Sequence, residues 1–114
     1  MTQEDKELLL KDLCARLPYE VKVKFYDHWV DEYEIIPLTA KLLSDTVYIG
    51  DVKPYLFPLS SMTEEQKKEE YEICKEYIIG YESNLIDFYN KYHLDYRGLI
   101  AQDLAIDATG LNIY

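Results

Sequence analysis

The chain is poor in the residues that mark the commonest catalytic and cofactor sites. Its four glycines are scattered through 114 residues, so there is no glycine-rich phosphate loop, and no Gly-x-Ser-x-Gly nucleophile elbow occurs. His28 and His93 are the only histidines. The carboxylates near them in sequence would have to converge from separate segments to complete a metal site. We therefore expect no catalytic residue, no cofactor and no metal, and we interpret both histidines as solvated loop residues.

Long hydrophobic runs are also absent. No apolar stretch approaches the roughly 18 residues of a membrane span, and residues 1–5 are acidic, unlike the basic start of a signal peptide. We therefore expect a cytoplasmic protein that does not contact a membrane. Its two cysteines, Cys14 and Cys74, fall on predicted apolar helix faces. This placement favours buried thiols over a disulfide or a reactive cysteine.

Positive charge is scarce, with 12 basic residues against 22 acidic ones and a net charge of −10. Binding to nucleic acid depends on cationic side chains that neutralise phosphates, so we expect no nucleic-acid partner. The acidic balance has two interpretations. It is the surface of a soluble protein, or it imitates the charge of DNA and blocks a DNA-binding protein.

Tyrosine, by contrast, is abundant, with 12 residues against three phenylalanines and one tryptophan. A tyrosine ring packs against apolar groups while its hydroxyl stays in water, which suits half-buried positions and interfaces alike. The tryptophan, Trp29, lies beside a predicted turn together with Tyr26 and His28. Exposed aromatic side chains at a hairpin tip are candidate binding anchors, and a position in the core or at its rim is the alternative.

The N-terminal segment, residues 1–18, is predicted to be a helix. Thr2 is a suitable N-cap, and Pro18 ends the pattern. Helical spacing predicts one buried stripe that consists of Leu10, Leu13, Cys14 and Leu17.

Residues 19–59 carry strand patterns. Residues 20–26 alternate apolar and polar, and residues 33–36 and 46–49 are rich in strand-forming side chains. The pattern in 38–43 fits a strand or a helical turn. Four or five short strands joined by short turns predict a small, curled antiparallel sheet, for which an SH3-like barrel is one specific possibility.

The stretch 53–63 ends the strand unit and is interpreted as an ordered strap. Pro54 and Pro58 exclude a helix through it. Its apolar side chains, Tyr55, Leu56 and Leu59, are predicted to pack between the two halves of the chain.

Residues 60–114 are predicted to hold two to three helices. Thr63 and Gln66 match a capping box for a helix that runs to Ile79, with Gly80 as its left-handed cap. Ser83 is predicted to cap a second helix. Residues 97–102 are predicted to form a short third helix, and the tail 103–114 has little structural signal. The whole chain, 1–114, is therefore interpreted as one α+β domain.

Residues 95–98, Asp-Tyr-Arg-Gly, combine an acid, a ring and a guanidinium at a predicted break. One interpretation is a polar recognition corner that includes Tyr96 and Arg97. The other is structural: Asp95 caps the short helix, Arg97 binds the acidic surface or a carbonyl group, and Gly98 permits close packing.

Three blocks resemble a group of short proteins from gut Bacteroidetes genomes and their prophages. Residues 53–65 are similar to that group's KPYLRPLSSMTEEE block, 95–100 match DYRGLI, and 12–19 resemble its usual opening. Phe57 departs from the pattern, since the group usually has arginine there. The resemblance implies a single fold and a phage or mobile-element context, and it implies no activity.

Together these observations predict a small acidic protein that acts as a non-enzymatic protein-interaction module of a mobile element or its host. Its partner would be another protein. The candidate interaction residues are Trp29, Tyr26, His28, Tyr96 and Arg97. An inhibitor that imitates DNA and an unrecognised enzyme with a deep polar pocket are the alternatives.

Overall fold

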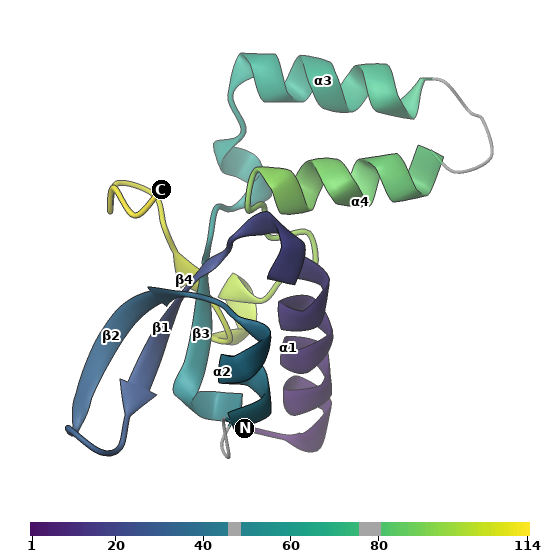
Figure 1. The fold of residues 1–114 in the computed structure, drawn as a ribbon. Helices are drawn as coiled ribbons and strands as arrows, with labels where there is room; N and C mark the ends of the chain where they lie inside the picture. Colours follow the sequence, from purple (N-terminus) through teal and green to yellow (C-terminus); the bar gives the residue numbers. More distant parts are fainter. Residues whose placement is uncertain (46–48, 76–80) are drawn as a thin grey trace.

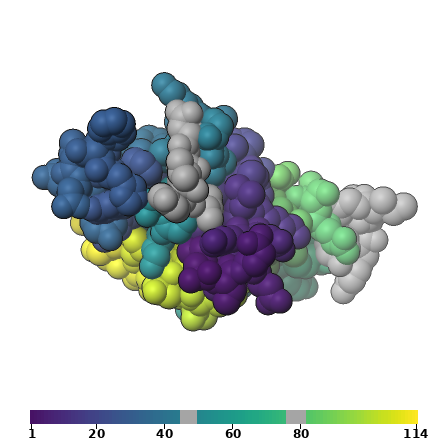
Figure 2. Space-filling model, turned by 90° about the horizontal axis from the view of Figure 1, so that it is seen from below, coloured from purple at the N-terminus to yellow at the C-terminus, as the bar shows by residue number. Residues whose placement is uncertain are grey.

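The computed structural model describes residues 1–45, 49–75 and 81–114 and shows an α+β fold (Figure 1). Its helices are α1 (Gln3–Arg16), α2 (Ala40–Asp45), α3 (Glu64–Cys74) and α4 (Tyr81–Lys91), with short 3-10 turns η1 (Leu17–Tyr19), η2 (Ile49–Asp51), η3 (Leu59–Ser61) and η4 (Ile100–Gln102). The molecule measures 49 × 30 × 23 Å. The β1–β2 hairpin projects at one end and the α3–α4 hairpin at the other (Figure 2).

The sheet is open and mixed. Its strands, in the spatial order β2-β1-β3-β4, are β2 (Glu32–Pro37), β1 (Lys22–Asp27), β3 (Val52–Leu56) and β4 (Ile106–Asp107). β1 pairs antiparallel with β2 and β3, whereas β4 is parallel to β3. The pairing is therefore mostly antiparallel, and β4 is the exception to the predicted antiparallel sheet. The possible SH3-like barrel is not formed, because β2 and the two-residue β4 are edges that do not meet. Most of residues 38–43 lie in helix α2, which begins at Ala40. The predicted strand at 46–49 falls largely outside the described residues.

Helix α1 buries a face that only partly overlaps the predicted stripe, since Leu13 is buried and Leu17 packs against the core as expected. Thr2 caps it as expected, through a reciprocal capping box with Asp5. Leu10 and Cys14, however, are exposed, and the prediction of a buried thiol at Cys14 is wrong. The buried face is formed by Leu9, Asp12, Leu13 and Arg16.

The hydrophobic core lies between α1, the sheet and the segment around η4. Its buried members are Leu9, Leu13, Val21, Val23, Leu38, Val52, Leu56, Leu99, Leu104 and Ala105. Leu42 and Leu43 of α2 pack against this cluster.

The strap docks as predicted at two of its three apolar positions. Tyr55 and Leu56 are buried, whereas Leu59 is 38% exposed. At its end, the Gln66 N–H donates to Thr63 Oγ1 at 3.1 Å, and the Thr63 N–H donates to Gln66 Oε1 at 3.0 Å. This reciprocal geometry confirms the predicted capping box.

The α3–α4 hairpin is held together by tyrosine–carboxylate hydrogen bonds. The hydroxyls of Tyr89 and Tyr92 donate to Glu70 at 2.7 Å and to Glu69 at 2.8 Å. Helix α4 begins at Tyr81, so the prediction that Ser83 caps it is wrong. The predicted end of α3 at Ile79 and Gly80 lies outside the described residues.

The C-terminal tail is ordered, contrary to its weak signal in the sequence. Residues 106–107 form β4, and the Ala108 N–H donates to the Leu56 carbonyl at 2.8 Å. The Tyr114 hydroxyl donates to the Tyr55 carbonyl at 2.7 Å and accepts from the Lys22 N–H at 2.9 Å. The segment 60–114 therefore completes the sheet as well as supplying helices.

Candidate functional site

The β1–β2 hairpin brings together three of the predicted interaction residues. The ring of Tyr26 packs edge-on against His28, with centroids 4.6 Å apart, and its centroid is 4.9 Å from that of Tyr33. His28 Nε2 lies 2.6 Å from a carboxylate oxygen of Asp51. Trp29 occupies the turn, where it is 97% exposed, so its ring is available to a partner.

The turn itself is set by two aspartates. The Asp27 carboxylate accepts the N–H of Trp29 at 2.9 Å, and Asp31 adopts a left-handed conformation with φ 54°. Aspartate suits both roles, because its short side chain bonds to nearby backbone and tolerates positive φ. These local preferences keep Trp29 at the tip of the hairpin.

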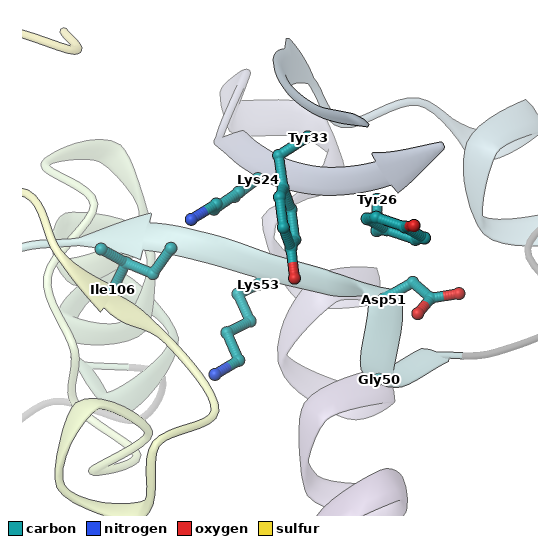
Figure 3. A pocket seen from close by; sticks show the side chains of 7 residues that line it. All are labelled: Lys24, Tyr26, Tyr33, Gly50, Asp51, Lys53 and Ile106. Atoms are coloured by element: carbon teal, nitrogen blue, oxygen red, sulfur yellow. The ribbon is translucent and has the colours of Figure 1, made fainter. Parts of the chain in front are cut away.

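A groove of about 320 Å³ lies beside this cluster on the outward face of the sheet (Figure 3). It is lined by Lys24, Tyr26, Tyr33, Gly50, Asp51, Lys53 and Ile106. The Lys24 ammonium lies 4.4 Å from the centroid of the Tyr33 ring, and Lys53 Nζ is 3.3 Å from Asp103. The groove thus combines aromatic surface with two ammonium groups.

The outward sheet face differs in charge from the chain as a whole. Side chains alternate between the two faces of a strand. Since Val23 and Val52 are buried in the core, Lys24 and Lys53 share the opposite, outward face. The outward positions of β1, β2 and β3 are Lys22, Lys24, Tyr26, Tyr33, Ile35, Pro37, Lys53 and Tyr55, and none of these residues is acidic.

The groove is lined by aromatic and charged side chains. The polar groups of the lining are the ammonium groups of Lys24 and Lys53, the hydroxyls of Tyr26 and Tyr33, and the Asp51 carboxylate. Within the described residues, no group of three histidine, cysteine, aspartate or glutamate side chains is placed to hold a metal ion. Aromatic rings and ammonium groups are, however, common contacts at protein interfaces.

Tyr96 and Arg97 belong to a different environment, a polar cluster beneath the C-terminal end of α1. Arg97 lies 2.9 Å from the carboxylate of buried Asp12, and the Arg16 guanidinium bonds to the other oxygen at 2.8 Å. Arg16 also donates to the Leu94 carbonyl at 2.7 Å, and both arginines lie near the Tyr96 ring, at 5.2 and 4.6 Å from its centroid.

This cluster ties the first helix to the last third of the chain. Asp95 accepts the N–H groups of Leu99 and Ile100 at 2.8 and 2.9 Å, as the structural interpretation predicted, and Gly98 has a positive φ of 75°. Tyr96 and Arg97 are thus committed to internal contacts. The geometry supports the structural interpretation of this corner over a recognition role.

A second cavity of about 310 Å³ lies between the strap, α4 and the C-terminus. The ring of His93 stacks on Tyr114 there, with centroids 3.9 Å apart. Burial, together with the nearby charges of Arg16 and Lys22, lowers the pKa of His93 to about 4. Our interpretation of His93 as a solvated loop residue is therefore wrong; it is a neutral packing residue near pH 7.

Sequence reasoning missed the side chains that complete the hairpin surface. Tyr33 and Ile35 of β2 are 64% and 54% exposed, and Lys24 and Lys53 line the groove. The signal was present in part, because 33–36 was predicted as a strand. The sequence does not reveal which face of this strand the rest of the fold leaves exposed.

Within the described residues, no helix combines the length and the apolar character that a bilayer crossing requires. Comparison of the chain with protein-family models, with curated proteins and with solved structures finds no match.

Proposed function

We propose that this protein is a non-enzymatic interaction module of a mobile element or its host, and that it binds a partner protein through the β1–β2 hairpin. The observation that carries the proposal is the exposure of four large apolar side chains on one hairpin, Trp29, Val30, Tyr33 and Ile35. A contiguous exposed apolar surface is typical of interaction sites. Tryptophan and tyrosine are also the residues most enriched among interface anchors.

The hairpin is prepared for binding by its own internal contacts. Tyr26 packs edge-on against Tyr33 and His28, and His28 is paired with Asp51 of η2, the turn that precedes β3. Ordering these rings in the free protein reduces the entropy lost when a partner binds. On binding, Trp29 would be the main hairpin side chain that passes from solvent into contact with the partner.

The two alternative functions have less support. A DNA mimic needs carboxylates in an uninterrupted pattern, but the glutamates of α3 alternate with Lys67 and Lys68, and Glu69 and Glu70 accept tyrosine hydroxyls. An enzyme needs convergent polar groups around a reacting atom. The groove lining offers two lysines, two tyrosine rings and one carboxylate, Asp51, which is already paired with His28.

The test compares two surfaces of the same protein. We expect a partner captured from cells that naturally make the protein to be lost, by about tenfold or more, when Trp29, Tyr33 and Ile35 are all changed to serine. The control is Tyr71→Ser on α3, where the side chain is 65% exposed but lies far from the hairpin; it should retain the partner.

Two results would overturn the proposal. One is equal recovery of the partner from the hairpin variant and the wild-type protein. The other is tight binding of a single-stranded oligonucleotide to the wild-type protein at physiological salt, since tyrosines and lysines also make stacking sites for bases. The net charge of −10 argues against that second result.

A further inference from the structure

The outer edge of β2 has no neighbouring strand among the residues that the structure describes. The sheet order places β2 at one end, beyond β1, and within the described ranges no hydrogen bond outside the sheet ladder reaches the backbone of Tyr33 or Ile35. Unpaired N–H and C=O groups at an edge are a template for another strand. The question is which residues of β2 present them.

The register answers this. In an antiparallel pair, residue pairs that exchange two hydrogen bonds alternate with pairs that exchange none. The Leu38 N–H donates to the Val21 carbonyl at 2.9 Å, so Val21 and Leu38 form a hydrogen-bonded pair. Counting two residues along each strand from this pair makes Val23–Ile36 and Phe25–Glu34 the next bonded pairs of the β1–β2 ladder. The intervening residues Tyr33 and Ile35 must direct their backbone groups to the free edge.

Two contacts on the other side of β1 support this phase. The Lys22 N–H donates to the Tyr114 hydroxyl at 2.9 Å, which lies away from β2. Pro54, which has no N–H, lies opposite Val23 on β3. This fits the assignment, because the backbone N–H and C=O of Val23 point toward β2 and need no partner on β3. The residues with free backbone groups, Tyr33 and Ile35, are therefore also those with exposed apolar side chains.

The side chains on the two faces of β2 differ in charge and polarity. Glu32 and Glu34 are exposed on the same face as Ile36, and within β2 no basic residue neutralises them. Tyr33 and Ile35 lie on the other face, beside Tyr26 and Lys24. Because opposite residues of paired strands share a face, an added strand would need basic side chains opposite the glutamates and apolar ones opposite Tyr33 and Ile35.

We propose that the partner contributes an extended segment in which lysine or arginine alternates with β-branched or aromatic residues, and that this segment pairs with β2 as a fifth strand. This inference rests on the proposed function, because it specifies how the hairpin binds its partner. The net charge of −10 also attracts a basic segment at long range. Main-chain hydrogen bonds would supply affinity, and the alternating side chains would supply specificity.

Two short blocked peptides serve as probes, one alternating lysine with valine and isoleucine, the other with glutamate in place of each lysine. We expect the wild-type protein to bind the lysine peptide about tenfold more tightly than the glutamate peptide. Glu34→Lys should reverse this preference. Glu7→Lys, the same charge change on exposed α1, should not.

The backbone contribution is tested at Ile35. Ile35→Pro removes the outward N–H but leaves the ladder to β1 intact, because proline is tolerated at a strand edge that faces solvent. It should lose binding of the lysine peptide, whereas Ile35→Ala, which keeps the N–H, should retain most of it. Thermal melts followed by circular dichroism establish that both variants are folded.

Three outcomes would overturn strand addition. Undiminished binding to Ile35→Pro would show that the peptide contacts side chains only, and absence of binding by either peptide would exclude the proposed segment. A concentration-dependent dimer that Ile35→Pro abolishes would make a second copy of this chain the occupant. The first two outcomes leave the hairpin as a binding surface, because capture of the natural partner with the serine variant tests that surface separately.

Discussion

Changing Asp12 to alanine is expected to destabilise the fold by about 3–5 kcal/mol, the range for removing one partner of a buried ion pair. Asp12 and Arg16 are fully buried, and the Asp12 carboxylate binds both Arg16 and Arg97. Without it, the Leu94 carbonyl is the one hydrogen-bond acceptor that the Arg16 guanidinium keeps among the described residues, and the Tyr96 ring is its other neighbour. An uncompensated charge would then remain in the interior.

Urea unfolding at neutral pH measures this effect, and a double variant shows its origin. Asp12→Leu combined with Arg16→Met removes both buried charges, so it should be less destabilised than Asp12→Leu alone. Lys11→Ala, on the exposed face of the same helix, is the control and should change the free energy of unfolding by less than about 0.5 kcal/mol. Equal losses in the single and double variants would show that Asp12 contributes by packing rather than by charge.

Leu56→Ala is expected to cost about 2–5 kcal/mol, the range for truncation of a fully buried leucine. Leu56 belongs to the core cluster and lies on β3, between β1 and β4. Its carbonyl also accepts the Ala108 N–H, so the side chain packs where the strap, α1 and the C-terminal segment meet. A cavity there would loosen all three.

Leu59 provides a matched control within the same strap. It is the same residue type three positions later, but it is partly exposed and lies outside the core cluster. Leu59→Ala should therefore lower the unfolding midpoint in urea much less than Leu56→Ala. Similar losses at the two positions would mean that the strap is not anchored through Leu56.

Features that depend on short stretches of chain were predictable from the sequence. The capping boxes at Thr2 and Thr63 need only residues three positions apart, and both are present. The burial of Tyr55 and Leu56 follows from their apolar character between two prolines. The hairpin strands were likewise recognisable from alternation and strand propensity.

Features that depend on distant partners were not predictable in the same way. The apolar spacing of α1 favoured Leu10 and Cys14, but Asp12 and Arg16 are buried instead because Leu94 and Arg97 meet them from the other end of the chain. β4 has two residues and no strand signal of its own, since it exists through its pairing with Tyr55 and Leu56. Periodicity counts apolar residues and cannot anticipate either contact.

The candidate site residues also differ in whether short stretches of chain or distant partners determine their role. Trp29 was recognisable as a turn residue, and Tyr26 and His28 followed from their positions beside it. Tyr96 and Arg97 carry similar residue types but belong to an internal network, because Arg16 and Asp12 of α1 contact them. Contacts with neighbouring side chains therefore decide whether an aromatic or cationic side chain is available to a partner.

Amide hydrogen exchange of the isolated protein tests the free β2 edge most directly, and it requires no partner. We expect the N–H groups of Tyr33 and Ile35 to exchange rapidly with solvent, because they point away from β1. Those of Glu34 and Ile36 should exchange slowly, because they donate into the β1–β2 ladder. Equal protection of all four amides, or slower exchange at Tyr33 and Ile35, would contradict the proposed edge.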